Sequence, residues 1–171
     1  MIQLNKNTIY ILVAVVVIII VVGAAAVMFL NNGGNNNGTT PTPTPTQSVA
    51  DATTLQFSAN VTSQGQTTEY KWYGKNLQSD VIIRVDVSTY AYILDEGQQK
   101  AWASTDSGAT WTTSDYTTDW AGWGAQWTEY VDKLANWTSG DYSYTNTAEE
   151  SIVLFNIIVN PTIPDSTFAT S

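Results

Sequence analysis

The chain has 171 residues and a formal net charge of −9, and it contains neither histidine nor cysteine. This composition excludes disulfides, thiol chemistry, His-dependent catalytic triads and soft-metal sites. All fifteen acidic residues follow position 50 with only five basic ones among them, so this part lacks the clustered Lys and Arg with which proteins hold nucleic acid.

An apolar run from Ile9 to Leu30 lies near the start of the chain. A helix needs about 20 residues to cross a bilayer core, so the run predicts a single transmembrane anchor within 1–30. The alternative is a signal peptide cleaved after Ala26, although the apolar part of such a peptide is usually only about 7–15 residues long. Lys6, the one charge before the run, predicts a cytoplasmic N-terminus and a C-terminal domain outside the cell membrane.

Residues 31–47 read as a stalk, first rich in Gly and Asn and then alternating Thr with Pro. The first half has too few apolar side chains to fold, and the prolines favour an extended second half. Three Asn-x-Thr sequons predict glycosylation at Asn37, Asn60 and Asn136.

The remaining residues, 48–171, suffice for one domain. Period-two alternation predicts strands. We expect these strands over 54–61, 67–73, 80–87, 90–94, 98–103, 141–146 and 151–159. The last segment, IVLFNIIV in its apolar part, has apolar residues on both faces, which predicts a central position in the sheet.

Between these strands, aromatic and apolar residues recur at spacings of four and three from Tyr116 to Trp137. This period predicts an amphipathic helix over about 115–138, capped by Ser114 or Asp115. Two glycines at positions 122 and 124 weaken its first half, so a break there is an alternative.

The helix must pack this aromatic stripe on one face of the sheet. We therefore expect an α+β fold in which a curved antiparallel sheet forms a half-barrel around one long amphipathic helix. The stripe favours plain core, and the alternative is the lining of a cavity for an apolar ligand. The candidate lining residues are Trp120, Trp123, Trp127, Leu134 and Trp137.

One local motif is specific. The segment from Ser104 to Trp111, STDSGATW, resembles the Asp-box of sialidases and other β-propellers. The resemblance implies a structural turn shaped by Ser104, Asp106, Gly108 and Trp111, which joins 99–103 to 111–113 in a hairpin. The chain is too short for a propeller, so no sialidase activity is expected.

Catalytic groups are scarce. Carboxylates occur in pairs at 95–96, 115 and 119, 129 and 132, and 149–150. We interpret these pairs as solvated surface, because acidic side chains are usually exposed. The sequence therefore predicts no enzyme, no cofactor and no metal site.

The order of parts resembles that of uncharacterised archaeal membrane-anchored surface proteins. The likeness rests on the segments 49–57, 75–76 and 160–168 and on Arg84. The strand–helix–strand order is also distantly similar to lipoprotein carriers of the LolA type, whose half-barrel holds acyl chains.

These observations favour a membrane-tethered domain outside the cell with a non-catalytic binding or cell-envelope structural role. The alternative is a LolA-like carrier or sensor of a lipid or other apolar ligand. A third class, sugar binding, requires aromatics on the outer sheet face, for which Tyr73, Tyr142 and Tyr144 are candidates. The expected partners are the membrane, through 9–30, and an envelope protein or lipid, but no nucleic acid.

Overall fold

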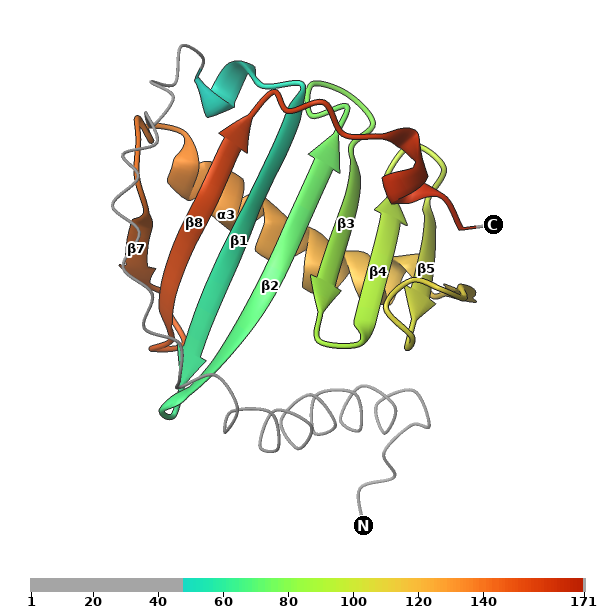
Figure 1. Cartoon of the computed structure of the whole chain (residues 1–171), viewed down its shortest axis with the longest axis horizontal. Coiled ribbons are helices and arrows are strands. Elements are labelled where there is room, and N and C mark those ends of the chain that lie inside the picture. The colour runs from blue at the N-terminus through green and yellow to red at the C-terminus, as the bar shows by residue number, and fades with distance from the viewer. Residues whose placement is uncertain (1–47, 171) are drawn as a thin grey trace, which may run out of the picture. The chain divides into compact units, whose positions relative to one another are not determined.

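In the computed structural model, eight antiparallel strands form one sheet with the order β6-β5-β4-β3-β2-β1-β8-β7 (Figure 1). The alternating sequence patterns are confirmed, since every expected strand is present. The strands are β1 Thr54–Ser63, β2 Gln66–Lys75, β3 Ile82–Val87, β4 Tyr90–Asp95, β5 Lys100–Ser104, β6 Thr112–Ser114, β7 Tyr142–Thr145 and β8 Ser151–Val159.

The structure describes residues 48–170. The predicted anchor, the predicted stalk and the sequon at Asn37 lie outside the described residues. Within the described part, no helix is long and apolar enough to cross a membrane. Two short 3-10 helices, η2 Val49–Asp51 and η4 Asp165–Phe168, lie near the two ends of this part.

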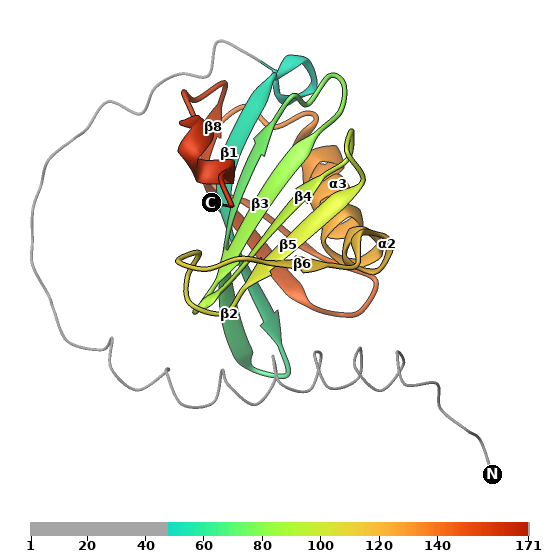
Figure 2. The same cartoon turned by 90° about the vertical axis from the view of Figure 1, so that its right-hand side faces the viewer.

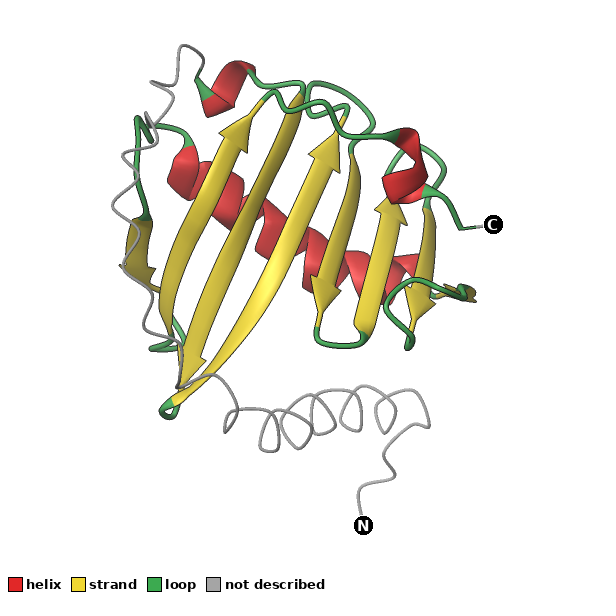
Figure 3. Cartoon of the chain, in the orientation of Figure 1, coloured by secondary structure: helices red, strands yellow, loops and turns green. Residues whose placement is uncertain are grey.

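A helix of 19 residues runs across one face of the sheet (Figure 3). It consists of α2 Tyr116–Asp119, the π-helical turn η3 Trp120–Gly124 and α3 Ala125–Leu134. The Asp115 carboxylate caps it by accepting the backbone N–H of Thr118 at 2.8 Å. Gly122 and Gly124 lie in the π turn, and the helix continues through it without a break. The helix ends at Leu134, four residues before the expected end.

The sheet is open and is not curled, so the prediction of a half-barrel is wrong. The helix lies on one side of the sheet and η4 on the other (Figure 2). The wide aromatic stripe predicts a curved sheet, but Gly74 on β2 leaves room for the ring of Trp127 against the strand backbone. The indole of Trp127 therefore packs directly on an open sheet.

Strand β8 is not central, contrary to the expectation from its apolar sequence. It lies second from the edge, between β1 and the short β7. Ile152 and Leu154 face the helix and are buried, whereas Phe155 and Ile158 face the other way and are partly or largely exposed. The strand contains a bulge near Asn156, whose φ is +52°.

The face of the sheet away from the helix is divided into two halves. Over β3, β4 and β5 it is covered by the hairpin that contains Trp111 and by the C-terminal segment that contains Thr167. The Arg84 guanidinium contacts both segments. Its Nη1 donates to the carbonyl oxygen of Thr167 at 2.8 Å, and its Cζ lies 5.5 Å from the ring centre of Trp111. Ala91 and Ile93 on this face of β4 are buried. Over β8, β1 and β2 the face stays open, and we call this half the open face.

The contact between Gly74 and Trp127 yields a stability prediction. A Cβ at position 74 would overlap the Trp127 ring, so Gly74→Ala should lower the free energy of unfolding by about 1–3 kcal/mol. Gly122→Ala is the matched control, since a Cβ there meets nothing within 4 Å and alanine favours helix by up to about 1 kcal/mol. Urea denaturation of both variants measures the difference. Equal stability of the two would contradict this packing.

Candidate functional site

The centre of the aromatic stripe is core. Trp127 is 4% exposed, and Tyr130 and Leu134 are fully buried. The Trp127 ring stacks on Phe57 with centroids 5.6 Å apart and lies 6.0 Å from the ring of Trp72. Rings in mutual contact fill the space between α3 and the sheet, which is what a packed interior requires.

The ends of the stripe are only partly buried. Trp123 packs against Tyr92 at 5.0 Å, and Trp120 stacks on Tyr116 at 5.5 Å. Trp137 follows the helix end, and its indole N–H donates to the Gly140 carbonyl at 2.8 Å. The five candidate lining residues therefore do not surround one chamber between helix and sheet.

An open groove of about 200 Å³ lies beside the helix, and we call it the helix groove. It brings Trp120 and Trp127 together, whereas Trp123, Leu134 and Trp137 do not line it. Its complete lining is Leu77, Ser79, Val81, Glu96, Trp120, Trp127, Thr128, Val131 and Asp132.

Two carboxylates give the helix groove its charge. One oxygen of Glu96 accepts the backbone N–H of Val81 at 3.3 Å. The Asp132 side chain has neither a hydrogen bond nor an ion pair with any part of the chain that the structure describes. None of the lining residues is basic. The groove is therefore an aromatic and aliphatic surface with negative charge and no internal counter-ion.

A second hollow, of about 240 Å³, lies on the open face. Its floor includes Ser58 of β1, only 7% exposed, which pairs with Lys71 on one side and with Phe155 on the other. The hollow also includes Tyr73, which confirms that this tyrosine faces outward. Sequence reasoning missed the hollow because only the strand register brings these distant residues together. Its complete lining is Gln56, Phe57, Ser58, Lys71, Tyr73 and Asn156.

The other two tyrosines proposed for the outer face are on the helix side. Tyr144 donates its hydroxyl to Glu129 of α3 at 2.8 Å, and Tyr142 packs against the core. Burial is the main cause that raises the pKa of Tyr144. The sequon Asn60 lies on β1 and is half-buried, while Asn136 is exposed just after the helix.

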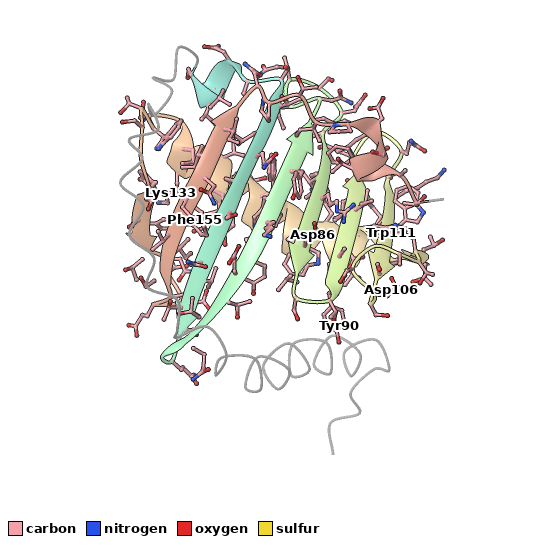
Figure 4. All side chains as sticks on the ribbon, viewed as in Figure 1. Asp86, Tyr90, Asp106, Trp111, Lys133 and Phe155 are labelled. Carbon is pink, nitrogen blue, oxygen red and sulfur yellow. The ribbon has the colours of Figure 1, made fainter. Side chains whose placement is uncertain are left out.

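The Asp-box segment forms the expected hairpin between β5 and β6. Asp106 Oδ1 accepts the Thr110 backbone N–H at 2.9 Å and the Ser104 hydroxyl at 2.6 Å. The Ser104 hydroxyl oxygen accepts the N–H of Gly108, whose φ is +89°. Figure 4 shows Asp106 and Trp111 at the same end of the sheet. The hydrogen bond from Ser104, followed by those from Thr110, lowers the pKa of Asp106 to about 2.

The sequence predicts that the paired carboxylates are solvated surface, but several of them accept hydrogen bonds in turns or at the start of the helix. Asp95 is buried and accepts the backbone N–H and the side-chain amide of Gln98, both at 2.8 Å. Burial raises the pKa of Asp119, whose carboxylate accepts the Ser114 hydroxyl at 2.5 Å. Across residues 48–170, no three acidic side chains are grouped as a metal site requires.

Comparisons of the chain with protein-family models, curated proteins and solved structures find no match. The resemblance to archaeal surface proteins and to LolA-type carriers stays a prediction.

The Asp106 turn predicts a specific response to acid. A carboxylate with a lowered pKa stabilises the fold above its ordinary pKa of 3.8, and this contribution is lost as the pH falls through about 2. Asp106→Asn should therefore lower the melting temperature at pH 6, and the difference from the wild type should shrink between about pH 4 and pH 2. Asp141→Asn, at an exposed position without a hydrogen bond in the described part, is the control. A difference that does not change with pH would refute the assignment.

Proposed function

We propose that the chain is a single-pass membrane-tethered domain outside the cell, with a non-catalytic binding role in the cell envelope, and that the open face is its binding surface. The observation that carries the proposal is the two-sided apolar character of β8. Its helix-facing side chains are buried, while Val153, Phe155 and Ile158 project from the uncovered face.

Exposed apolar surface of this kind favours a partner. Ile158 is 47% exposed, the only large hydrophobic residue exposed to this degree in the described part. Phe155 is in view on this face in Figure 4 and lies beside the hollow that contains Lys71 and Tyr73. Burying apolar surface yields roughly 25 cal/mol per Å², and an apolar centre with a polar rim is typical of protein interfaces.

The proposed location rests on the sequence. The run from Ile9 to Leu30 has the length of a spanning helix, and Lys6 before it favours a cytoplasmic N-terminus. The Thr-Pro segment before residue 48 suits a spacer. The acidic domain would be repelled by anionic headgroups, so the partner on the open face is an envelope protein and not the bilayer itself.

The carrier alternative has less support. It requires a chamber between helix and sheet, where the rings of Phe57, Trp72 and Trp127 are in contact. The helix groove is open and, at about 200 Å³, smaller than the usual 300–1,000 Å³ of ligand pockets. An acyl chain is therefore a poorer match than a partner on the open face.

The location can be tested in intact cells with the full chain. External protease should remove the C-terminal domain, and the chain should remain with membranes through a high-salt wash. A chain without residues 9–30 should lose the membrane association. Protection from external protease in intact cells, with cleavage only after lysis, would overturn the proposed orientation.

The open face can be tested by a double variant, Phe155→Ser with Ile158→Ser. Losing these contacts should weaken binding of the full chain to purified cell envelopes by about tenfold or more, because each buried large apolar side chain contributes about 1.5–3 kcal/mol. Co-sedimentation measures the binding, and circular dichroism checks the fold. Val131→Thr on the helix is the control and should bind normally. Unchanged binding by the double variant would refute the assignment of the surface.

A further inference from the structure

The hollow on the open face gathers polar side chains that the fold itself does not use. Five of its six lining residues are polar, and none of the five has a side-chain hydrogen bond or an ion pair with the part of the chain that the structure describes. The sixth, Phe57, stacks its ring on Trp127 on the helix side. The five polar residues are Gln56, Ser58, Lys71, Tyr73 and Asn156.

Ser58 is the most shielded of these groups. It is only 7% exposed because it is a small residue that pairs with Lys71 on one side and with Phe155 on the other. A hydroxyl can donate and accept a hydrogen bond, and a shielded polar group without a partner lowers stability. A polar ligand that reaches the floor of the hollow would supply the missing partner.

A bulge in β8 adds Asn156 to the wall of the hollow. Consecutive residues of a regular strand point to opposite faces. Here Phe155 and Asn156 both lie on the open face, and Ile157 packs against the core. The register between β1 and β8 shifts at this point, and the φ of Asn156 is +52°. Bulges often re-aim a side chain beside a functional site, and this one brings a second primary amide into the hollow with that of Gln56.

Lys71 gives the hollow a positive charge that the described chain does not neutralise. Asp86 pairs with Lys71 across β2 and β3, but the Asp86 carboxylate accepts the Nε–H of Arg84 at 2.8 Å. No acidic residue lines the hollow. An ammonium group only donates hydrogen bonds, and its strongest partners are anionic oxygens. The hollow therefore favours a ligand that bears a carboxylate.

The neutral groups favour hydroxyls on the same ligand. The amides of Gln56 and Asn156 both donate and accept hydrogen bonds, and so does a serine or tyrosine hydroxyl. A carboxylate alone only accepts, whereas the hydroxyls of a sugar do both. The volume of about 240 Å³ is below that of drug-sized ligand pockets, which suits a single sugar unit. Together with Lys71, these groups select a sugar that carries a carboxylate.

We propose that the hollow binds one acidic sugar unit, a hexuronic acid, of a glycan carried by the envelope partner. The sugar carboxylate contacts Lys71, and the sugar hydroxyls bond to Ser58 and to the two amides. Phe155 and Ile158 contact the protein part of the partner. The inference rests on the proposed binding role of the open face and makes the partner a glycoprotein.

Glucuronate is the probe, added to the full chain in a polyoxyethylene detergent, which has no sugar headgroup. Nuclear magnetic resonance of side-chain amide groups reports binding at Gln56 and Asn156. Both signals should shift with glucuronate and saturate. Glucose, which lacks the carboxylate, should bind about fivefold more weakly, because Lys71 then has no anionic partner.

Matched variants assign the contacts. Lys71→Met keeps the aliphatic stem and should weaken glucuronate about fivefold, with glucose binding changed by less than about twofold. Lys100→Met, at an exposed position outside the hollow, is the control and should leave both sugars unaffected. Ser58→Ala should weaken both sugars about fivefold, since a sugar hydroxyl loses its partner. Circular dichroism checks the fold, and either variant is informative without the other.

Purified envelopes test the source of the sugar. Periodate cleaves the vicinal diols of sugars, so periodate-treated envelopes should lose binding of the full chain in co-sedimentation. Free glucuronate should compete with untreated envelopes. The double variant Phe155→Ser with Ile158→Ser should still bind glucuronate, because neither residue lines the hollow.

Three results would overturn the proposal. One is the absence of any shift of the Gln56 and Asn156 signals at high glucuronate concentration. Another is equal binding of glucuronate and glucose, and the third is equal binding of the chain to treated and untreated envelopes. With any of these, loss of envelope binding by the double variant would still support the open face. Unchanged envelope binding by the double variant, with glucuronate bound, would instead refute the proposed function alone.

Discussion

The contact between the Trp127 ring and the backbone of Gly74 is the constraint on which the rest of the domain depends. A strand with a side chain at this position would hold the helix farther from the sheet. Gly74 removes that obstacle, so the indole can stack on Phe57 and approach Trp72 in a single aromatic layer. Close packing of this layer then leaves Trp120, one π turn earlier, at the margin where the helix groove begins.

The two faces of the sheet are stabilised by different means. On one face, the helix buries the alternating apolar residues of β1, β2, β3 and β8. On the other, Arg84 joins Trp111 and the carbonyl of Thr167 to cover β4. One guanidinium serves both contacts because it has five donors and a flat cationic face. The cover reaches only the end of β2, where Lys75 contacts Asp165 and Phe168, so most of the outer surface of β8, β1 and β2 remains available to a partner.

The open face and the helix groove differ in chemistry as well as in position. The open face joins Phe155 and Ile158 to a polar hollow, and on the proposal made for it this surface suits a protein partner. The helix groove is lined by aromatic, aliphatic and acidic side chains.

The sequence by itself determined the α+β class, the order of the strands along the chain, the helix and the hairpin at Ser104–Trp111, because hydrophobic period and turn chemistry are local properties. It wrongly predicted a central position for β8, which lies second from the edge of the sheet. Apolar residues on both faces of a strand indicate burial only where other elements cover both faces. Tertiary structure alone decided the open sheet, the hollow around Ser58 and the groove that unites Glu96 with Trp120 and Trp127. These features depend on strand register and on which ring meets which backbone, and both are set by contacts between residues far apart in the chain.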